Sequence, residues 1–140
     1  MEGSTALLLI AAVVVMGVLL FALITMTKKG NNQLDVEKYR VRWLTIERQL
    51  KKDEESSYHL AVLNADKLFD HALKEKGFPG KVMADRLKNA QDRLNNKDSV
   101  WSAHKLRNKI AHEPEITVSY EDARQALAAF KASLKDLEAI

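Results

Sequence analysis

The residue types best suited to chemistry lie in one short segment, Arg107-Asn108-Lys109-Ile110-Ala111-His112. An imidazole ordinarily titrates near neutral pH, so His112 can take a proton from a hydroxyl or return one to a leaving oxygen. Arg107 offers planar donors and a charge that it does not lose, which suits an anionic phosphorane. This pair of residue types suits proton transfer at a phosphate group on which negative charge develops.

Neighbouring side chains are candidates for support of this chemistry. Asn108 lies four residues before His112, one helical turn away, and is expected to orient it by a hydrogen bond. Lys105 and Lys109 are expected to bind substrate phosphates. His104 is expected to be a partly exposed helix histidine in a supporting position.

The spacing within the motif sets a geometric condition. On an unbroken helix, Arg107 and His112 are five positions, or about 140°, apart and do not meet one phosphate. We therefore expect the helix to unwind near Ala111, which Pro114 favours, or a dimer in which both motifs line one cleft.

Arg107 points toward the apolar side of its helix and needs a buried acidic partner, for which Asp66 is the candidate. The competing interpretation is that Arg107, Asn108, His112 and Asp66 form a purely structural network without catalysis. Trp43 and Trp101 are expected to be core or dimer-interface anchors.

Several other chemistries are disfavoured by the sequence. The chain has no cysteine, which excludes disulfides, thiolate metal sites and cysteine nucleophiles. It has no His-Glu-x-x-His pair, no glycine-rich phosphate loop before a helix and no serine nucleophile elbow. His104 and His112 with Asn108 between them make a poor metal site. We expect no metal and no cofactor.

Apolar residues recur every three or four positions through most of the chain after residue 33, which predicts an all-α bundle of four to five helices. The second predicted helix stops at Gly77 and the fourth is capped by Asp98 or Ser99. Ser119 and Asp122 form a capping box before the last helix. Asn95 and Asn96 are interpreted as a fraying helix end. The apolar positions of the five predicted helices run from Val36 to Leu50, Tyr58 to Ala72, Met83 to Leu94, Val100 to Ile110 and Ala123 to Leu137.

The first part of the chain has a different composition. Residues 6–26 carry no charge and are long enough for a helix to cross the hydrocarbon core. A cleaved signal peptide is the alternative, but Glu2 is the only charge before the apolar run. Lys28 and Lys29 follow the run, so the positive-inside rule places the N-terminus outside and the rest in the cytoplasm. The sequence thus predicts a single-pass anchor of the plasma (inner) membrane over 1–27, a linker over 28–33 and a helical domain over 34–140.

Arg107-Asn108-x-x-x-His112 resembles the Arg-x(4–6)-His motif of the HEPN superfamily, including the polar residue that follows the arginine. The predicted bundle and the place of the motif in a late helix are also similar to that family, so the resemblance covers roughly residues 34–138. It implies a metal-independent endoribonuclease that acts on RNA as a homodimer, with Arg107, Asn108 and His112 as catalytic residues. Other members of the family have lost catalysis and only bind.

Two further possibilities stay open. One is a non-catalytic helical module held at the membrane to bind nucleic acid or an unidentified protein partner. The other concerns charge: residues 28–52 hold eight basic and three acidic side chains, a net charge of +5, which favours electrostatic docking on anionic lipid.

Overall fold

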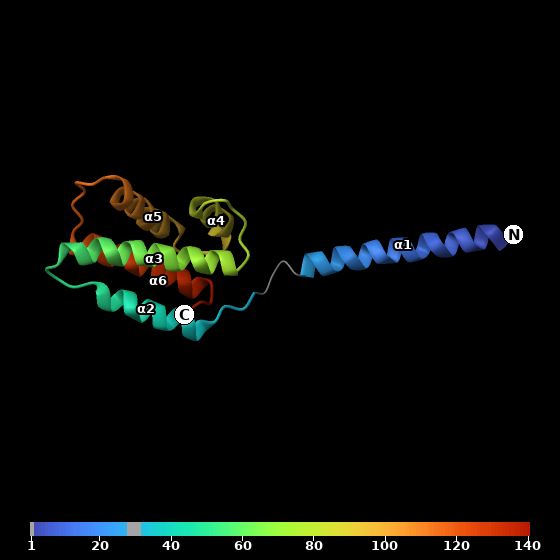
Figure 1. Ribbon diagram of the computed structural model, residues 1–140, viewed down its shortest axis with the longest axis horizontal. Helices are drawn as coiled ribbons and strands as arrows, with labels where there is room; N and C mark the ends of the chain where they lie inside the picture. The colour runs from blue at the N-terminus through green and yellow to red at the C-terminus, as the bar shows by residue number, and fades with distance from the viewer. Residues whose placement is uncertain (1, 28–31) are drawn as a thin grey trace. The chain divides into compact units, whose positions relative to one another are not determined.

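The computed structural model describes residues 2–27 and 32–140, with side chains described for 3–24 and 32–140. These residues form six α-helices and one short 3-10 helix (Figure 1). The chain divides into two units, Met1–Asn31 and Asn32–Ile140. Most of the predicted linker, residues 28–31, lies outside the described residues. The elements are α1 (Glu2–Thr27), α2 (Val36–Gln49), α3 (Glu55–Glu75), α4 (Met83–Ala90), η1 (Gln91–Arg93), α5 (Lys97–His112) and α6 (Tyr120–Asp136).

The first unit is the single helix α1. Its large apolar side chains, from Leu7 to Ile24, are all exposed to solvent. The segment Gly3–Ile24 is long and apolar enough to cross a membrane. No other helix among the described residues meets this condition. Length and composition of this kind fit a membrane anchor or a signal sequence equally.

The second unit is a bundle built around α3, and the predicted all-α fold is confirmed. α3 packs against α6, α2, α5 and α4, with α2 and α5 on opposite sides of it (Figure 1). The apolar residues of α3 recur at helical spacing, and Ala61, Ala65, Phe69 and Ala72 are fully buried. The rings of Phe69 and Phe130 meet with centroids 5.9 Å apart, which joins α3 to α6 in the centre of the core.

The turn between α3 and α4 depends on two glycines and one buried ion pair. Gly77, with φ of +86°, ends α3 as predicted. Gly80 has φ of +157°, and a Cβ there would lie 2.6 Å from the Cβ of Asp85. Arg86 donates to Asp70 from Nε (2.7 Å) and to the carbonyl of Gly80 from Nη1 (2.7 Å), so it holds the turn against α3.

The start of α5 differs from the prediction. The N-cap position is Asn96, before both Asp98 and Ser99, and the preceding helix α4 ends early, at Ala90, with η1 following it. Asn95 and Asn96 are not a fraying end. Asn95 donates to Asp136 from its backbone N (2.9 Å) and from Nδ2 (2.7 Å), which ties this loop to α6.

The side chain of Asn96 is held by α6 in the same way. Its Nδ2 donates to the carbonyl of Ala129 (3.0 Å), and its Oδ1 accepts from Ser133 (3.0 Å). At the other end of α6 the predicted capping box is confirmed: Ser119 Oγ accepts from the backbone N of Asp122 (3.0 Å), whose carboxylate accepts from Ser119 N (3.2 Å).

Candidate functional site

Four polar side chains form a closed ring of contacts between α3 and α5. Asp66 Oδ1 lies 2.7 Å from His104 Nδ1, and His104 Nε2 lies 3.3 Å from Asn108 Nδ2. Arg107 Nη1 donates to Asn108 Oδ1 (3.0 Å). Arg107 Nε lies 3.2 Å from Asp66 Oδ2 and closes the ring.

Helical spacing brings three of these residues together. His104, Arg107 and Asn108 are related by three and four positions, so they lie on neighbouring parts of one helix face. That face continues the buried residues Val100 and Ala103, which pack toward α3. The ring is therefore a polar extension of the apolar contact between α5 and α3.

Asp66 is the buried charge of the ring, with 4% of its surface exposed. A carboxylate in such a position needs both a counter-charge and hydrogen bonds to offset the loss of water. Arg107 supplies the charge and His104 supplies the hydrogen bond. The predicted contact between Arg107 and Asp66 is present.

The hydrogen-bond directions assign the proton on His104. Asn108 uses Oδ1 to accept from Arg107, so its Nδ2 faces the imidazole and donates to Nε2. The other nitrogen, Nδ1, then carries the hydrogen that is donated to Asp66. Both ring nitrogens of His104 thus have partners within the protein.

The expectation that His104 is partly exposed is wrong, because only 6% of its surface is exposed. It lies under Trp101, whose ring meets the imidazole edge-on with centroids 6.1 Å apart. Trp101 itself is half-buried against the core, and Trp43 is buried within it. The available signal was that His104 falls four positions after Val100, on the same side of the helix.

The Arg107 side chain contacts the buried Asp66 on one side and is exposed to solvent on the other. Its side chain is 35% exposed although its partner carboxylate is 5% exposed. The Nε–Asp66 contact is an ion pair whose angle does not make a hydrogen bond, so the attraction there is mainly electrostatic. Among the described residues no hydrogen bond engages Nη2 of Arg107, which leaves that donor for a ligand.

His112 does not join Arg107. The helix does not unwind near Ala111: α5 continues unbroken through His112 and ends where Glu113 becomes extended, with φ of −112° and ψ of 98°. Pro114 restricts the residue immediately before it, so the break falls after His112. Arg107 and His112 therefore diverge by about 140° around α5.

The predicted hydrogen bond between Asn108 and His112 is not present in the structure. His112 is exposed, and among the described residues no side-chain hydrogen bond or ion pair involves it. Asn108 bonds to Arg107 and His104, so it does not orient His112. Lys105 and Lys109 are exposed on α5 and stay candidates for phosphate binding.

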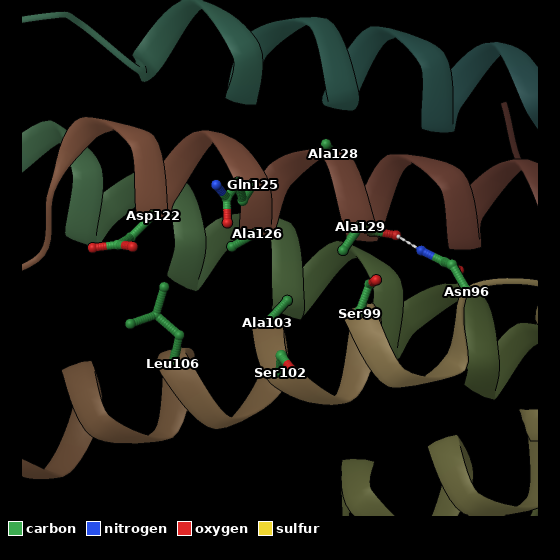
Figure 2. Close-up of a pocket in the computed structure, with 10 residues that line it drawn as sticks. All are labelled: Asn96, Ser99, Ser102, Ala103, Leu106, Asp122, Gln125, Ala126, Ala128 and Ala129. Atoms are coloured by element: carbon green, nitrogen blue, oxygen red, sulfur yellow. Dashed lines mark hydrogen bonds between the residues drawn. The ribbon is translucent and has the colours of Figure 1, made fainter.

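A separate groove of about 690 Å³ lies between α5 and α6 (Figure 2). The hydrogen bond from Asn96 to Ala129 crosses one end of it, and Leu106 and Asp122 stand at the other. None of the four ring residues lines this groove. Within the described residues no group of three or more histidine or acidic side chains is arranged to hold a metal ion.

A scan against models of protein families finds no match for the chain. Searches of curated proteins and of solved structures likewise find no significant similarity. The structure thus establishes an all-helical protein with an exposed N-terminal apolar helix.

Proposed function

We propose that the chain is a membrane-anchored, HEPN-like endoribonuclease that cleaves RNA without a metal ion. The observation that carries this proposal is the state of Arg107: Asp66 fixes it from within, and a third of its side chain stays exposed. A positioned guanidinium with free donors is what a phosphorane needs for stabilisation.

In this proposal each motif residue has a distinct part. Arg107 binds the scissile phosphate and stabilises the charge that develops on it. His112, exposed at the end of α5, takes the proton of the 2′-hydroxyl or returns one to the leaving oxygen. Asn108 and His104 are positioning residues that hold Arg107 and Asp66. Lys105 and Lys109 bind neighbouring phosphates.

The divergence of Arg107 and His112 along α5 requires a second copy of the chain. In a homodimer the Arg107 of one protomer and the His112 of its partner share one cleft, so no unwinding of α5 is needed. The resemblance of Arg107-Asn108-x-x-x-His112 to the HEPN motif supports the same arrangement.

The anchor completes the proposal. Residues 6–26 of α1 span the plasma (inner) membrane once, and Lys28 and Lys29 keep residues 34–140 in the cytoplasm. The exposure of every large apolar side chain described in α1 supports this role, because such a surface requires a lipid environment.

The test is cleavage of RNA by the full chain in detergent with EDTA present. We expect cleavage with a 2′,3′-cyclic phosphate end in the wild type, and its loss in His112→Gln and Arg107→Lys. Lys keeps the charge of Arg107 but not its planar fork. The exposed Lys135→Gln is the matched control and should cleave normally. Cleavage that requires a metal ion, or that persists in His112→Gln, would contradict the proposal.

A second candidate is favoured by one observation, the absence of His112 from the ring. In that case the chain binds RNA through Arg107, Lys105 and Lys109 without cutting it. The measurement that separates the two is binding of fluorescent RNA alongside the cleavage assay. Binding that is lost in Lys105→Gln/Lys109→Gln, with no cleavage by the wild type, would select the binding module.

A further inference from the structure

The outer face of α2 combines exposed apolar residues with basic ones. Outside α1, the exposed large apolar residues of the described chain are few and mostly gather on α2 and the adjacent part of α3. They are Val36, Val41, Leu44, Leu60 and Val82. Four of these five belong to α2 or α3, and α5 and α6 contribute none.

The position of these residues on α2 follows from its periodicity. Tyr39, Trp43 and Ile46 are the buried side of the helix. Val41 and Leu44, which are 54% and 44% exposed, are on the opposite side together with Arg48. Packing in the bundle explains the apolar residues on the buried side of α2. It does not explain the apolar residues on the outer side.

Basic side chains surround this apolar surface. Arg48 and Thr45 line an open groove with Leu60 of α3, and Arg42 and Val41 line another with Lys67 of α3. We refer to Val41, Leu44, Leu60, Arg42, Arg48 and Lys67 as the α2 surface.

The charges of the α2 surface are not neutralised within the protein. No ion pair among the described residues involves Arg42, Arg48 or Lys67, whereas the neighbouring Lys38 is paired with Glu75 (3.3 Å). Two acidic residues lie close to this face, and each has a partner of its own. Glu47, which precedes Arg48, is paired with Lys131 of α6. Glu54, which lines the groove of Arg48 and Leu60, lies 3.3 Å from Lys51. The α2 surface therefore presents a net positive charge around apolar side chains, which is the combination that binds an anionic bilayer.

The short connection between α1 and α2 favours a lipid bilayer as the binding partner of the α2 surface. Nine residue steps separate Thr27 from Val36, so the chain between them spans at most about 30 Å. A basic and apolar helix that follows a membrane anchor so closely meets lipid headgroups at a high effective concentration. The segment 28–52, which comprises this connection, α2 and the residues just after α2, has a net charge of +5.

We propose that the α2 surface docks on the anionic cytoplasmic face of the membrane that holds α1. Val41, Leu44 and Leu60 enter the headgroup region, and Arg42, Arg48 and Lys67 bind lipid phosphates. This inference rests on the proposed anchor and orientation. It leaves α5 free, because α5 lies on the opposite side of α3 from α2 (Figure 1).

The absence of cysteine allows a single-probe test on the full chain. Leu44→Cys carries an environment-sensitive dye, and the chain is placed in nanodiscs of phosphatidylcholine with or without phosphatidylglycerol. Ser102→Cys on the exposed side of α5 is the matched control site. We expect a blue shift of the dye at position 44 only, only with phosphatidylglycerol, and its loss at high salt.

Charge variants test whether the basic residues of the α2 surface contribute to docking. In the Leu44→Cys chain, Arg42→Gln/Arg48→Gln should weaken docking about 25-fold, since each basic side chain near an anionic surface strengthens binding about fivefold. Arg93→Gln/Lys97→Gln, which removes two exposed charges elsewhere, should leave docking unchanged.

Three results would overturn the inference. These are an equal shift in phosphatidylcholine alone, an equal shift at position 102, or a shift that requires two chains in one nanodisc, which would mean that a second copy covers the face. Incorporation is read separately by co-purification with the nanodisc. A chain that stays outside contradicts the anchor and removes the basis of docking with it, whereas incorporation without a dye shift contradicts docking alone.

Discussion

Arg107 on α5 lies 3.2 Å from the carboxylate of Asp66 on α3, and the two residues differ sharply in exposure. The carboxylate is almost completely buried, while a third of the arginine side chain is open to solvent. The ion pair therefore connects the interior of the bundle to a surface position. Its strength decides how firmly the guanidinium is held there.

The Asp66–Arg107 pair is expected to be strongly coupled. Asp66→Asn should lower the free energy of unfolding by about 1–3 kcal/mol, because it disturbs the buried hydrogen bond to His104, while Arg107 loses its counter-charge but stays partly hydrated. A double-mutant cycle with Arg107→Met should give a coupling energy of about 1–3 kcal/mol in urea unfolding. The exposed pair Lys51–Glu54 is the control, and its coupling should stay below about 0.5 kcal/mol. Equal coupling in the two cycles would contradict the ring.

The two histidines of the motif region should differ in their effect on stability. His104→Gln should lower the free energy of unfolding by about 2–4 kcal/mol, since both of its nitrogens are engaged in a buried position. His112→Gln should change it by less than about 0.5 kcal/mol, because His112 is exposed. Thermal unfolding followed by circular dichroism compares them directly. A large loss in His112→Gln would show that His112 has a structural role.

Gly80 is expected to tolerate no side chain. Gly80→Ala should lower the free energy of unfolding by about 2–4 kcal/mol, because the new Cβ would meet Asp85 and the backbone conformation disfavours L-residues. Gly77→Ala is the matched control. Gly77 also has a positive φ, but a Cβ added there would lie 3.8 Å from Asn32 Nδ2, an ordinary contact, so only the conformational cost of about 1 kcal/mol applies. Equal losses would show that the contact at Gly80 relaxes freely.

Asp70 is expected to make stability depend on acid pH. Burial alone would raise the pKa of Asp70, but hydrogen bonds from Arg86 and Lys74 outweigh it and hold the pKa below the ordinary value. Because the folded pKa is the lower one, the stabilisation is complete above the unfolded pKa and is lost as pH falls through the folded pKa. Asp70→Asn should therefore lower the free energy of unfolding by about 2–3 kcal/mol at pH 7.

The difference between Asp70→Asn and wild type should shrink as pH falls below about 4. Urea unfolding at a series of pH values measures it. Asp92→Asn, at an exposed position on η1, should follow the wild type throughout. A difference that stays constant down to pH 2 would show that the charge of Asp70 does not contribute.

Local signals predicted the helices well. The apolar spacing of α2, α3 and α6, the glycine stop at Gly77 and the capping box at Ser119 all depend on residues within one or two turns. The start of α5 was missed for the opposite reason. Asn96 is fixed by Ala129 and Ser133, more than thirty residues away, and no local pattern carries that information.

The site was predictable only in part for the same reason. Asp66 was identified because Arg107 continues the apolar side of its helix and a buried guanidinium needs an acid. The place of His104 in the ring depends on how α5 is rotated against α3, which is set by tertiary packing. The expected unwinding at Ala111 was wrong because Pro114 acts on Glu113 alone.

The polar ring joins Asp66 to His104 and Arg107, which are synthesised about forty residues later, so the ring forms late during translation. α1 ends at Thr27 and α5 ends at His112, so 85 residues separate the two events. At roughly 5–20 residues per second, that interval is on the order of 4–17 s. The apolar helix leaves the ribosome first, and Asp66 gains its partners only near the end of translation. Under the proposed function, the membrane helix is therefore complete before Arg107 is in place, and the RNA-cleaving site assembles only late in synthesis.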